Sequence, residues 1–169
     1  MMKIILSSNS PRRKELLSEL DVNFEVRVIE GIDESYPENM PTEKVPQYIA
    51  CEKAGAYMVA KGEVLLTADT VVVLDNDIMG KPHNEHEAMQ MLRRLSGKTH
   101  QVITGVCLTT TERQVTFSDI TDVTFAELTN DEIKFYVEKY RPLDKAGAYG
   151  IQEWIGLAAV TAIKGIYFN

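Results

Sequence analysis

The chain has 169 residues, a length that predicts one domain. Apolar residues make up 44% and charged residues 25%, close to the averages of soluble globular proteins, which excludes disordered, collagen-like and disulfide-scaffold classes. The formal net charge of −7 opposes stable binding of nucleic acid through the overall field of the protein. An anionic ligand would therefore have to be held by a local group of cations.

The two cysteines, Cys51 and Cys107, lie far apart and lack the spacing of a zinc site or a redox pair, so we expect ordinary buried thiols. No apolar run reaches the roughly 18 residues of a membrane span. The first eight residues are too short for the apolar core of a secretion signal. These observations predict a cytoplasmic protein that does not enter a membrane.

The chain opens with a strand, a loop and a helix. Lys3–Leu6 is a short β-prone run, and Ser10 and Pro11 are suited to the N-cap and first position of a helix. An apolar stripe at helical spacing follows, formed by Leu16, Leu17 and Leu20. Val22–Val28 then alternates between apolar and polar residues, which predicts a strand with one buried face.

An acidic segment, Glu30–Pro41, contains a glycine and two prolines and is predicted to be an exposed loop. Thr42 can cap a helix that reaches about Lys61 and is stopped by Gly62. Two β-branched runs, Val64–Thr67 and Val71–Leu74, are predicted to be separate strands, and an Asp-Asn-Asp turn leads from them into Ile78–Met79.

The second half begins with a helix from the cap Asn84 to just before Gly97, with acidic residues in its first turn and basic residues in its last. Two long β-prone runs, Gln101–Thr110 and Gln114–Phe125, predict a hairpin. Thr129 caps the next helix. A glycine-rich loop over 143–152 follows, and 157–168 is predicted to be a hairpin that turns at 164–165. This interleaving of strands and helices indicates an α/β protein with a mixed sheet.

The first turn of the first helix breaks a local electrostatic rule, because Arg12, Arg13 and Lys14 lie where the helix dipole favours anions. A phosphate bound at this end would explain the arrangement, since free N–H groups and guanidinium groups both match phosphate oxygens. The alternatives are a solvated basic turn or pairing with the acidic loop around Asp33 and Glu34.

Asp69 follows the apolar run that ends at Thr67–Ala68, so its carboxylate is expected at a strand end, where α/β proteins place ligands. A turn or helix-cap role is the alternative. Lys53 leans towards the apolar stripe of its helix and either reaches water or meets an anion. Lys81 ends a short strand and precedes a proline.

Glu34 and Asp33 offer hard oxygen ligands that suit Mg²⁺ or Mn²⁺, although acidic pairs in loops are usually solvated. Leu95–Thr99 lacks the first glycine of a phosphate loop and ends a helix instead of opening one, which excludes that motif. The three histidines have no metal-binding spacing, and we assign them no chemistry.

Several motifs occur in the order found in the Maf proteins, which are nucleoside triphosphate pyrophosphatases related in fold to the inosine triphosphatases. They are Ser7–Leu17, Ala68–Val72, Gly80–Pro82, Leu95–His100, Thr104–Val106 and Asp144–Gln152. The chain resembles this family from Ile4 to about Tyr167. The resemblance implies a mixed, elongated β-sheet flanked by helices with a central cleft.

The resemblance also implies a reaction, in which a nucleoside triphosphate and water give the monophosphate and pyrophosphate with the help of a divalent metal, Mg²⁺ or Mn²⁺. Members that act on dTTP and UTP carry the residues found here as Arg12, Thr70 and Gln152. Members that act on 7-methyl-GTP have Trp and Gln at the first two positions and an acidic residue near the third. All three positions therefore favour pyrimidines.

The resemblance makes Asp69 the proton acceptor. We hypothesise that Asp69 acts as the general base or as a metal ligand that positions the water, with Glu34 as the second metal ligand. Arg13, Lys53 and Lys81 are expected to bind phosphate oxygens, and Ser8 to donate a hydrogen bond to them.

The family continues beyond the last predicted hairpin into a final helix, so we expect one domain over residues 1–169 without that helix. A homodimer is compatible with the sequence, and the expected partner is the nucleotide substrate. Two alternatives stay open. One is a house-cleaning pyrophosphatase for modified pyrimidine nucleotides, and the other is a non-catalytic nucleotide-binding regulator of cell division.

Overall fold

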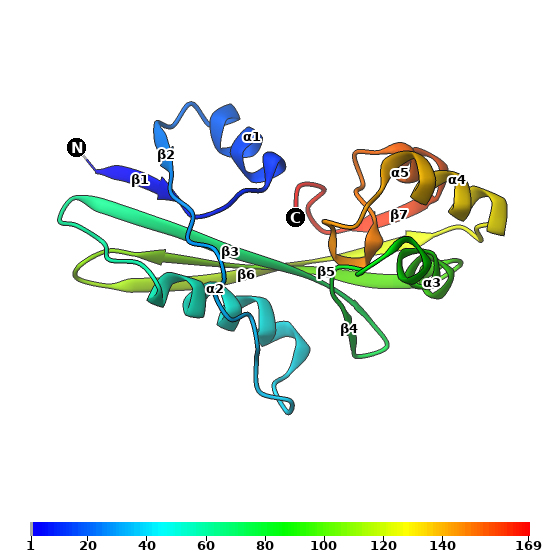
Figure 1. Ribbon diagram of the computed structural model, residues 1–169, viewed down its shortest axis with the longest axis horizontal. Helices are drawn as coiled ribbons and strands as arrows, with labels where there is room; N and C mark the ends of the chain where they lie inside the picture. The colour runs from blue at the N-terminus through cyan, green and yellow to red at the C-terminus, as the bar shows by residue number, and fades with distance from the viewer. Residues whose placement is uncertain (1) are drawn as a thin grey trace. The chain divides into compact units, whose positions relative to one another are not determined.

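A computed structural model of the protein describes residues 2–169, so residue 1 of the predicted domain lies outside the described part (Figure 1). The strands are β1 (Lys3–Leu6), β2 (Phe24–Val26), β3 (Glu63–Leu74), β4 (Asp77–Met79), β5 (Thr99–Thr109), β6 (Gln114–Phe125) and β7 (Val160–Lys164). The helices are α1 (Pro11–Glu19), α2 (Val45–Gly55), α3 (Glu85–Leu95), α4 (Asn130–Tyr140) and α5 (Trp154–Ala158), with short 3-10 turns η1 (Thr42–Lys44) and η2 (Ala146–Ala148).

Within residues 2–169, the strands form one 7-stranded mixed sheet in the order β2-β1-β3-β5-β6-β7, with β4 paired to β3. The chain divides into two compact units. Unit 1 comprises the described part of Met1–Asp69 together with Thr104–Ser118, and unit 2 comprises Thr70–Ile103 and Asp119–Asn169. The expectation of a single domain over 1–169, and that of a central cleft, stay predictions.

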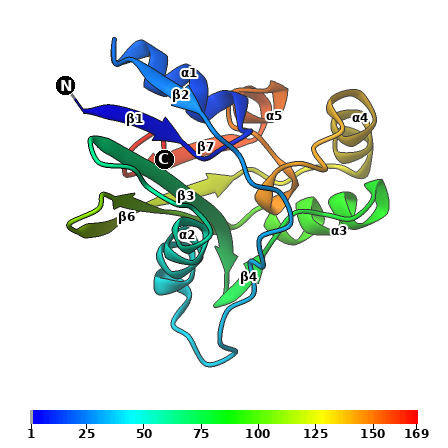
Figure 2. The same cartoon turned by 60° about the vertical axis from the view of Figure 1, so that its left-hand side comes forward.

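In unit 1, β1 lies between β2 and β3 and runs parallel to both (Figure 2). The helix α2 packs on this part of the sheet through a small core formed by Ile5, Ala50, Ala54, Tyr57, Leu65 and Cys107. As expected, Ser10 caps α1, because its side chain accepts a hydrogen bond from the Arg13 N–H. Leu20 does not join the predicted apolar stripe, since it is 69% exposed just beyond the helix.

In unit 2, β4 forms a hairpin with the end of β3, and β7 pairs antiparallel with the end of β6. The helices α3 and α4 pack against each other beside a larger core that includes Leu92, Phe125 and Tyr136. Both helices begin as predicted. Asn84 caps α3, and Thr129 forms a capping box with Glu132 at the start of α4.

Two predicted elements of unit 1 were wrong in extent. The strand predicted over Val22–Val28 shrinks to β2, which has a single neighbour at the end of the strand order and buries none of its residues. The helix predicted from Thr42 begins at Val45 instead, because Pro46 fits only the first turn of a helix. It ends at Gly55, and Tyr57 beyond it turns back into the core.

The separate strands predicted at Val64–Thr67 and Val71–Leu74 are one continuous strand, β3. The predicted C-terminal hairpin was also wrong. β7 pairs with β6, and the residues after Lys164 form a turn in which the Ile166 N–H donates a hydrogen bond to Thr121 Oγ1. Sequence reasoning missed α5, which has only five residues.

Within residues 2–169, no helix has the length and apolar character that crossing a bilayer requires. Neither cysteine is in a disulfide. Cys107 is buried as expected, whereas Cys51 is half-buried.

Candidate active site

The site in unit 1 forms where β1 ends. The last residue of β1, Leu6, lies opposite Leu66 of β3, and the Ser7 N–H donates to the Leu66 carbonyl. The chain then turns into α1. Asp69 lies three residues farther along β3. The prediction that it stands at the end of its own strand was therefore wrong. Its carboxylate instead lies beyond the carboxyl end of the shorter neighbour, β1, which is where ligands bind in open α/β sheets.

Lys53, from α2, bridges the two acidic residues of the predicted site. Its ammonium nitrogen Nζ lies 2.8 Å from Asp69 Oδ1 and 2.9 Å from Glu34 Oε1. The side chains of Lys53 and Asp69 are only 14% and 13% exposed, whereas that of Glu34 is 51% exposed. Of the two alternatives for Lys53, the lysine that meets an anion is therefore the correct one. Glu34 is paired and is not merely solvated.

Arg13 brings a second cation to the same place. Its guanidinium Nη1 donates to the carbonyl of Ala68 at 2.9 Å and to Ser8 Oγ at 3.4 Å. Burial lowers the pKa of Arg13, and the nearby Asp69 carboxylate opposes that shift. The solvated alternative for the basic turn is thus wrong for Arg13, while Arg12 is exposed on the same turn.

Ser8 is buried and links the start of α1 to the Arg13 side chain. Its hydroxyl oxygen accepts from the Ser10 N–H as well as from Arg13. The preceding residue, Ser7, donates to the hydroxyl of Tyr57 at 2.6 Å, and that hydroxyl also accepts from the Ile29 N–H. The loop that leads into α1 is therefore fixed from two sides.

Glu34 and Asp69 are the candidate ligands of a divalent cation. A carboxylate oxygen of each residue contacts the same cation, the Lys53 ammonium group, so the two carboxylates face a common position. Mg²⁺ is commonly held by one or two carboxylates, with substrate phosphates and water supplying the other ligands. The pair fits that pattern. Among the described residues, no group of three or more His, Cys, Asp or Glu side chains forms a further metal site.

The remaining predicted residues, Thr70, Lys81 and Gln152, belong to unit 2. Thr70 follows Asp69 on β3, so its side chain points to the opposite face of the strand. Lys81 and Gln152 are exposed. The segment that carries Gln152 reaches the residue before Lys81, because the Gly147 N–H donates to the Gly80 carbonyl at 3.1 Å.

A cluster at the two ends of this segment holds it in place. Lys145 Nζ lies 3.3 Å from a carboxylate oxygen of Glu153, which also accepts a hydrogen bond from the hydroxyl of Tyr136. The same hydroxyl accepts from the Gly150 N–H at 3.1 Å. We call the residues between the two charged ends, 146–152, the clasped segment.

Sequence reasoning missed Thr67 and Tyr57 as partners of the site. Thr67 is fully buried and donates to the Ala50 carbonyl of α2 at 2.6 Å. It stands between Leu65 and Asp69 on one face of β3. A hydroxyl in the middle of an apolar strand face was the available signal, because such a group needs a partner when it is buried.

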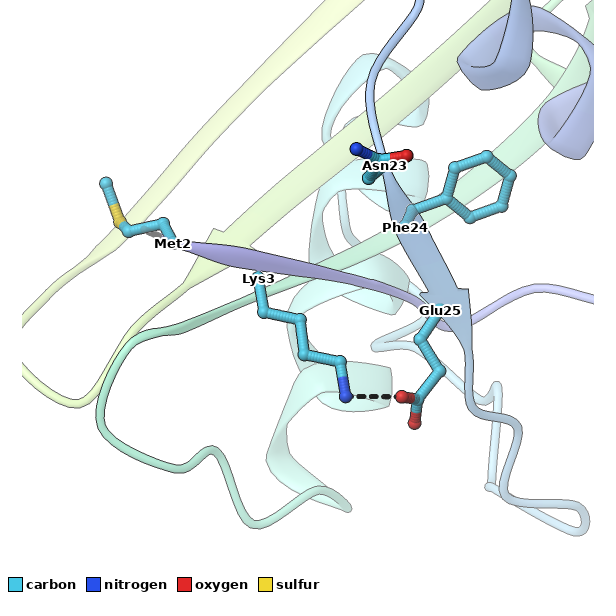
Figure 3. Close-up of a pocket in the computed structure, with 5 residues that line it drawn as sticks. All are labelled: Met2, Lys3, Asn23, Phe24 and Glu25. Carbon is cyan, nitrogen blue, oxygen red and sulfur yellow. Dashed lines mark ion pairs between the residues drawn. The ribbon is translucent and has the colours of Figure 1, made fainter.

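A hollow lies elsewhere in unit 1, at the start of β1 and β2 (Figure 3). Its lining residues are Met2, Lys3, Asn23, Phe24 and Glu25, and an ion pair joins Lys3 to Glu25. None of the predicted site residues lines it.

The fold resembles that of a solved HAM1 protein from Coxiella burnetii, with a TM-score of 0.50 and 16% sequence identity over 94% of this chain and 92% of that one. At this identity the likeness concerns the fold alone. It confirms the predicted mixed α/β class. The Maf-like protein family matches residues 3–169, and the chain belongs to that family.

Similar proteins carry a common name. A dTTP/UTP pyrophosphatase of Phocaeicola vulgatus is 60% identical over 99% of this chain and 88% of its own length. A protein of the same name from Bacteroides thetaiotaomicron is 54% identical over the same shares, and one from Flavobacterium psychrophilum is 47% identical over 99% of this chain and 86% of its own length.

Proposed function

We propose that this protein is a nucleoside triphosphate pyrophosphatase that hydrolyses dTTP and UTP to the monophosphate and pyrophosphate. The observation that carries the proposal is the group formed by Lys53, Arg13 and Asp69. Two cations largely withdrawn from solvent and one carboxylate meet beyond the end of β1, in a chain whose net charge is −7. The relatives named dTTP/UTP pyrophosphatase support the substrate class.

The reaction places different demands on these residues. Water attacks the α-phosphorus, and the bond between that phosphorus and the oxygen bridging to the β-phosphorus breaks, which releases pyrophosphate. Asp69 accepts the proton of the attacking water, or orients that water. Arg13 and Lys53 bind the phosphate oxygens and stabilise the negative charge that moves onto the leaving pyrophosphate. Ser8 hydrogen-bonds to the same tail.

Glu34 and Asp69 would hold a divalent cation, Mg²⁺ or Mn²⁺. When bound, it would neutralise phosphate charge and lower the pKa of a coordinated water. Lys81 would add a phosphate contact, and Thr70 and Gln152, with Arg12, would select the base. A side-chain amide such as that of Gln152 offers both a donor and an acceptor to the edge of uracil or thymine.

The deciding experiment measures pyrophosphate release from a panel of nucleoside triphosphates, with Mg²⁺, with Mn²⁺ and with a chelator. We expect turnover of dTTP and UTP above that of GTP and 7-methyl-GTP, and none with the chelator. Asp69→Asn should lose about 10²–10⁴-fold in kcat, the usual size of a general-base contribution, and should still bind dTTP. A protein that binds dTTP and releases no pyrophosphate would overturn the proposal.

A further inference from the structure

The helix α2 contacts the sheet at three places that follow one face of the helix. Its first turn, Pro46–Gln47, lies against Gly105 of β5. Its middle residue Ala50 accepts a hydrogen bond from Thr67, and near its end Lys53 pairs with Asp69. The intervals of three and four residues between these contacts are those of neighbours on a helix surface.

Gly105 sets how closely α2 approaches the sheet. A Cβ atom at this position would lie 2.3 Å from the backbone nitrogen of Gln47 and 2.4 Å from the carbonyl carbon of Pro46. Both are backbone atoms, so a side chain could be accommodated only if the helix moved. The position belongs to the Thr104–Val106 motif, which has no role in the proposed reaction.

Thr67 sets the position of α2 along and around its axis. Its hydroxyl is fully buried and lies 2.6 Å from the Ala50 carbonyl, with the Cys107 carbonyl 3.4 Å away. A valine of nearly the same shape would still fill the space, but the attachment of α2 at this point would be lost. The apolar contacts around it, which have no direction, would leave the helix free to turn or slide by a fraction of an ångström.

We propose that Thr67 and Gly105 are positioning residues for the reaction, which hold α2 so that the Lys53 ammonium stays in contact with Asp69. The inference rests on the proposed function, since it requires that Lys53 and Asp69 act in turnover. A displacement of about 1 Å between groups that must act together is enough to reduce a rate about 100-fold, even when the altered residue touches no substrate.

The test compares kcat and KM for dTTP in four variants. Thr67→Val should lower kcat about tenfold with a smaller change in KM, and Thr67→Ser, which keeps the hydroxyl, should restore most of the rate. Gly105→Ala should lower kcat by up to about 100-fold. Gly55→Ala is the matched control, because it lies in the same helix and a Cβ there meets no atom within 4 Å.

A double-mutant comparison separates positioning from a general structural role. If Thr67 acts through Lys53, then Thr67→Val should cost less than about twofold in a Lys53→Ala background, since the pair it supports is already gone. An equal loss in both backgrounds, or an unchanged kcat in Thr67→Val alone, overturns the inference. Full turnover in Lys53→Ala would instead overturn the assignment of Lys53 under the proposed function. If Gly105→Ala fails to fold, the Thr67 variants still decide the matter.

Discussion

His100 is a buried histidine with an unusual cost of protonation. It is 1% exposed on β5, packs edge-on against the rings of Phe125 and Tyr149, and shares a hydrogen bond of 2.6 Å with the Tyr149 hydroxyl. Among the described residues its second ring nitrogen, Nδ1, has no hydrogen-bond partner. Burial lowers the pKa of His100 from 6.5 to about 4.

The shift predicts how stability depends on pH. In the unfolded chain His100 takes up a proton below about pH 6.5, whereas in the folded protein it stays neutral down to about pH 4. Its contribution is therefore complete above pH 6.5 and is lost as the pH falls towards 4. Between pH 7.5 and pH 5 the free energy of unfolding should drop by about 2 kcal/mol from this residue.

Urea unfolding at the two pH values checks this prediction. His100→Gln should remove most of the drop, whatever its own stability, while His86→Gln, an exposed histidine, should keep it. A variant at position 100 with the same pH dependence as the parent would contradict the assignment. Carboxyl groups with a lowered pKa, such as Glu63 with a pKa of about 2, lose their contribution to the free energy of unfolding mainly below pH 5.

The candidate site shows which residue roles a sequence reveals. Arg13 stood out because three cations at a helix start contradict the helix dipole, and the structure gives one of them a buried carbonyl partner. Lys53 was ambiguous, since a lysine near an apolar stripe can reach either water or an anion. Glu34 precedes Lys53 by 19 residues and Asp69 follows it by 16, so only the fold brings the two carboxylates into contact with the lysine.

At the scale of elements, the clasped segment offers a test of base selection. The Tyr136 hydroxyl joins Glu153 at one end of the segment to Gly150 within it, two residues from Gln152. Tyr136→Phe removes that link and leaves a buried N–H group without its acceptor. We expect a loss of about 1–3 kcal/mol in stability and a several-fold weaker preference for dTTP over GTP.

The measurement is kcat/KM for both nucleotides, together with thermal unfolding. Tyr140→Phe makes the same change one turn along α4, on a ring stacked against Tyr136 at 5.1 Å, and should leave the preference intact. If Tyr136→Phe lowers stability but keeps the parent preference, the clasp is purely structural. If Gln152→Ala also keeps it, the base-reading role of Gln152 is wrong as well.

Some elements could be predicted because the information lies within a few residues. The caps Ser10, Asn84 and Thr129 each bond to an N–H group three residues ahead, so the sequence contains both partners. The extent of β3 could not be predicted in this way. The polar residues Asp69 and Thr70 resemble a break between two strands in the sequence. In the structure they point to opposite faces of one strand, whose length depends on distant pairing partners.

At the scale of the whole molecule, the net charge of −7 and the local cations act against each other. A triphosphate approaching the protein is repelled by the average field, which is screened beyond roughly 10 Å at 0.1 M salt. It is attracted at short range by local cations such as Arg13 and Lys53. An acidic protein can therefore bind a small anion such as a triphosphate and still repel a long polyanion such as nucleic acid.

The two compact units share three strands, and this sharing predicts how the protein unfolds. β3 passes from unit 1 to unit 2 after Asp69, β5 passes from unit 2 to unit 1 after Ile103, and β6 returns to unit 2 after Ser118. Neither unit can lose its strands without fraying those of the other. We therefore expect a single cooperative transition, as in small one-domain proteins.

Two probes test this expectation during unfolding in urea. The fluorescence of Trp154, the only tryptophan, reports on unit 2, whereas hydrogen exchange of the amides that pair β1 with β3 reports on unit 1. Coincident midpoints and equal free energies support one folding unit over residues 1–169. Protection of the β1 amides that persists after the Trp154 signal has changed would show that unit 1 folds alone. In that case the first half of β3 would stay paired with β1 although the second half, in unit 2, had unfolded.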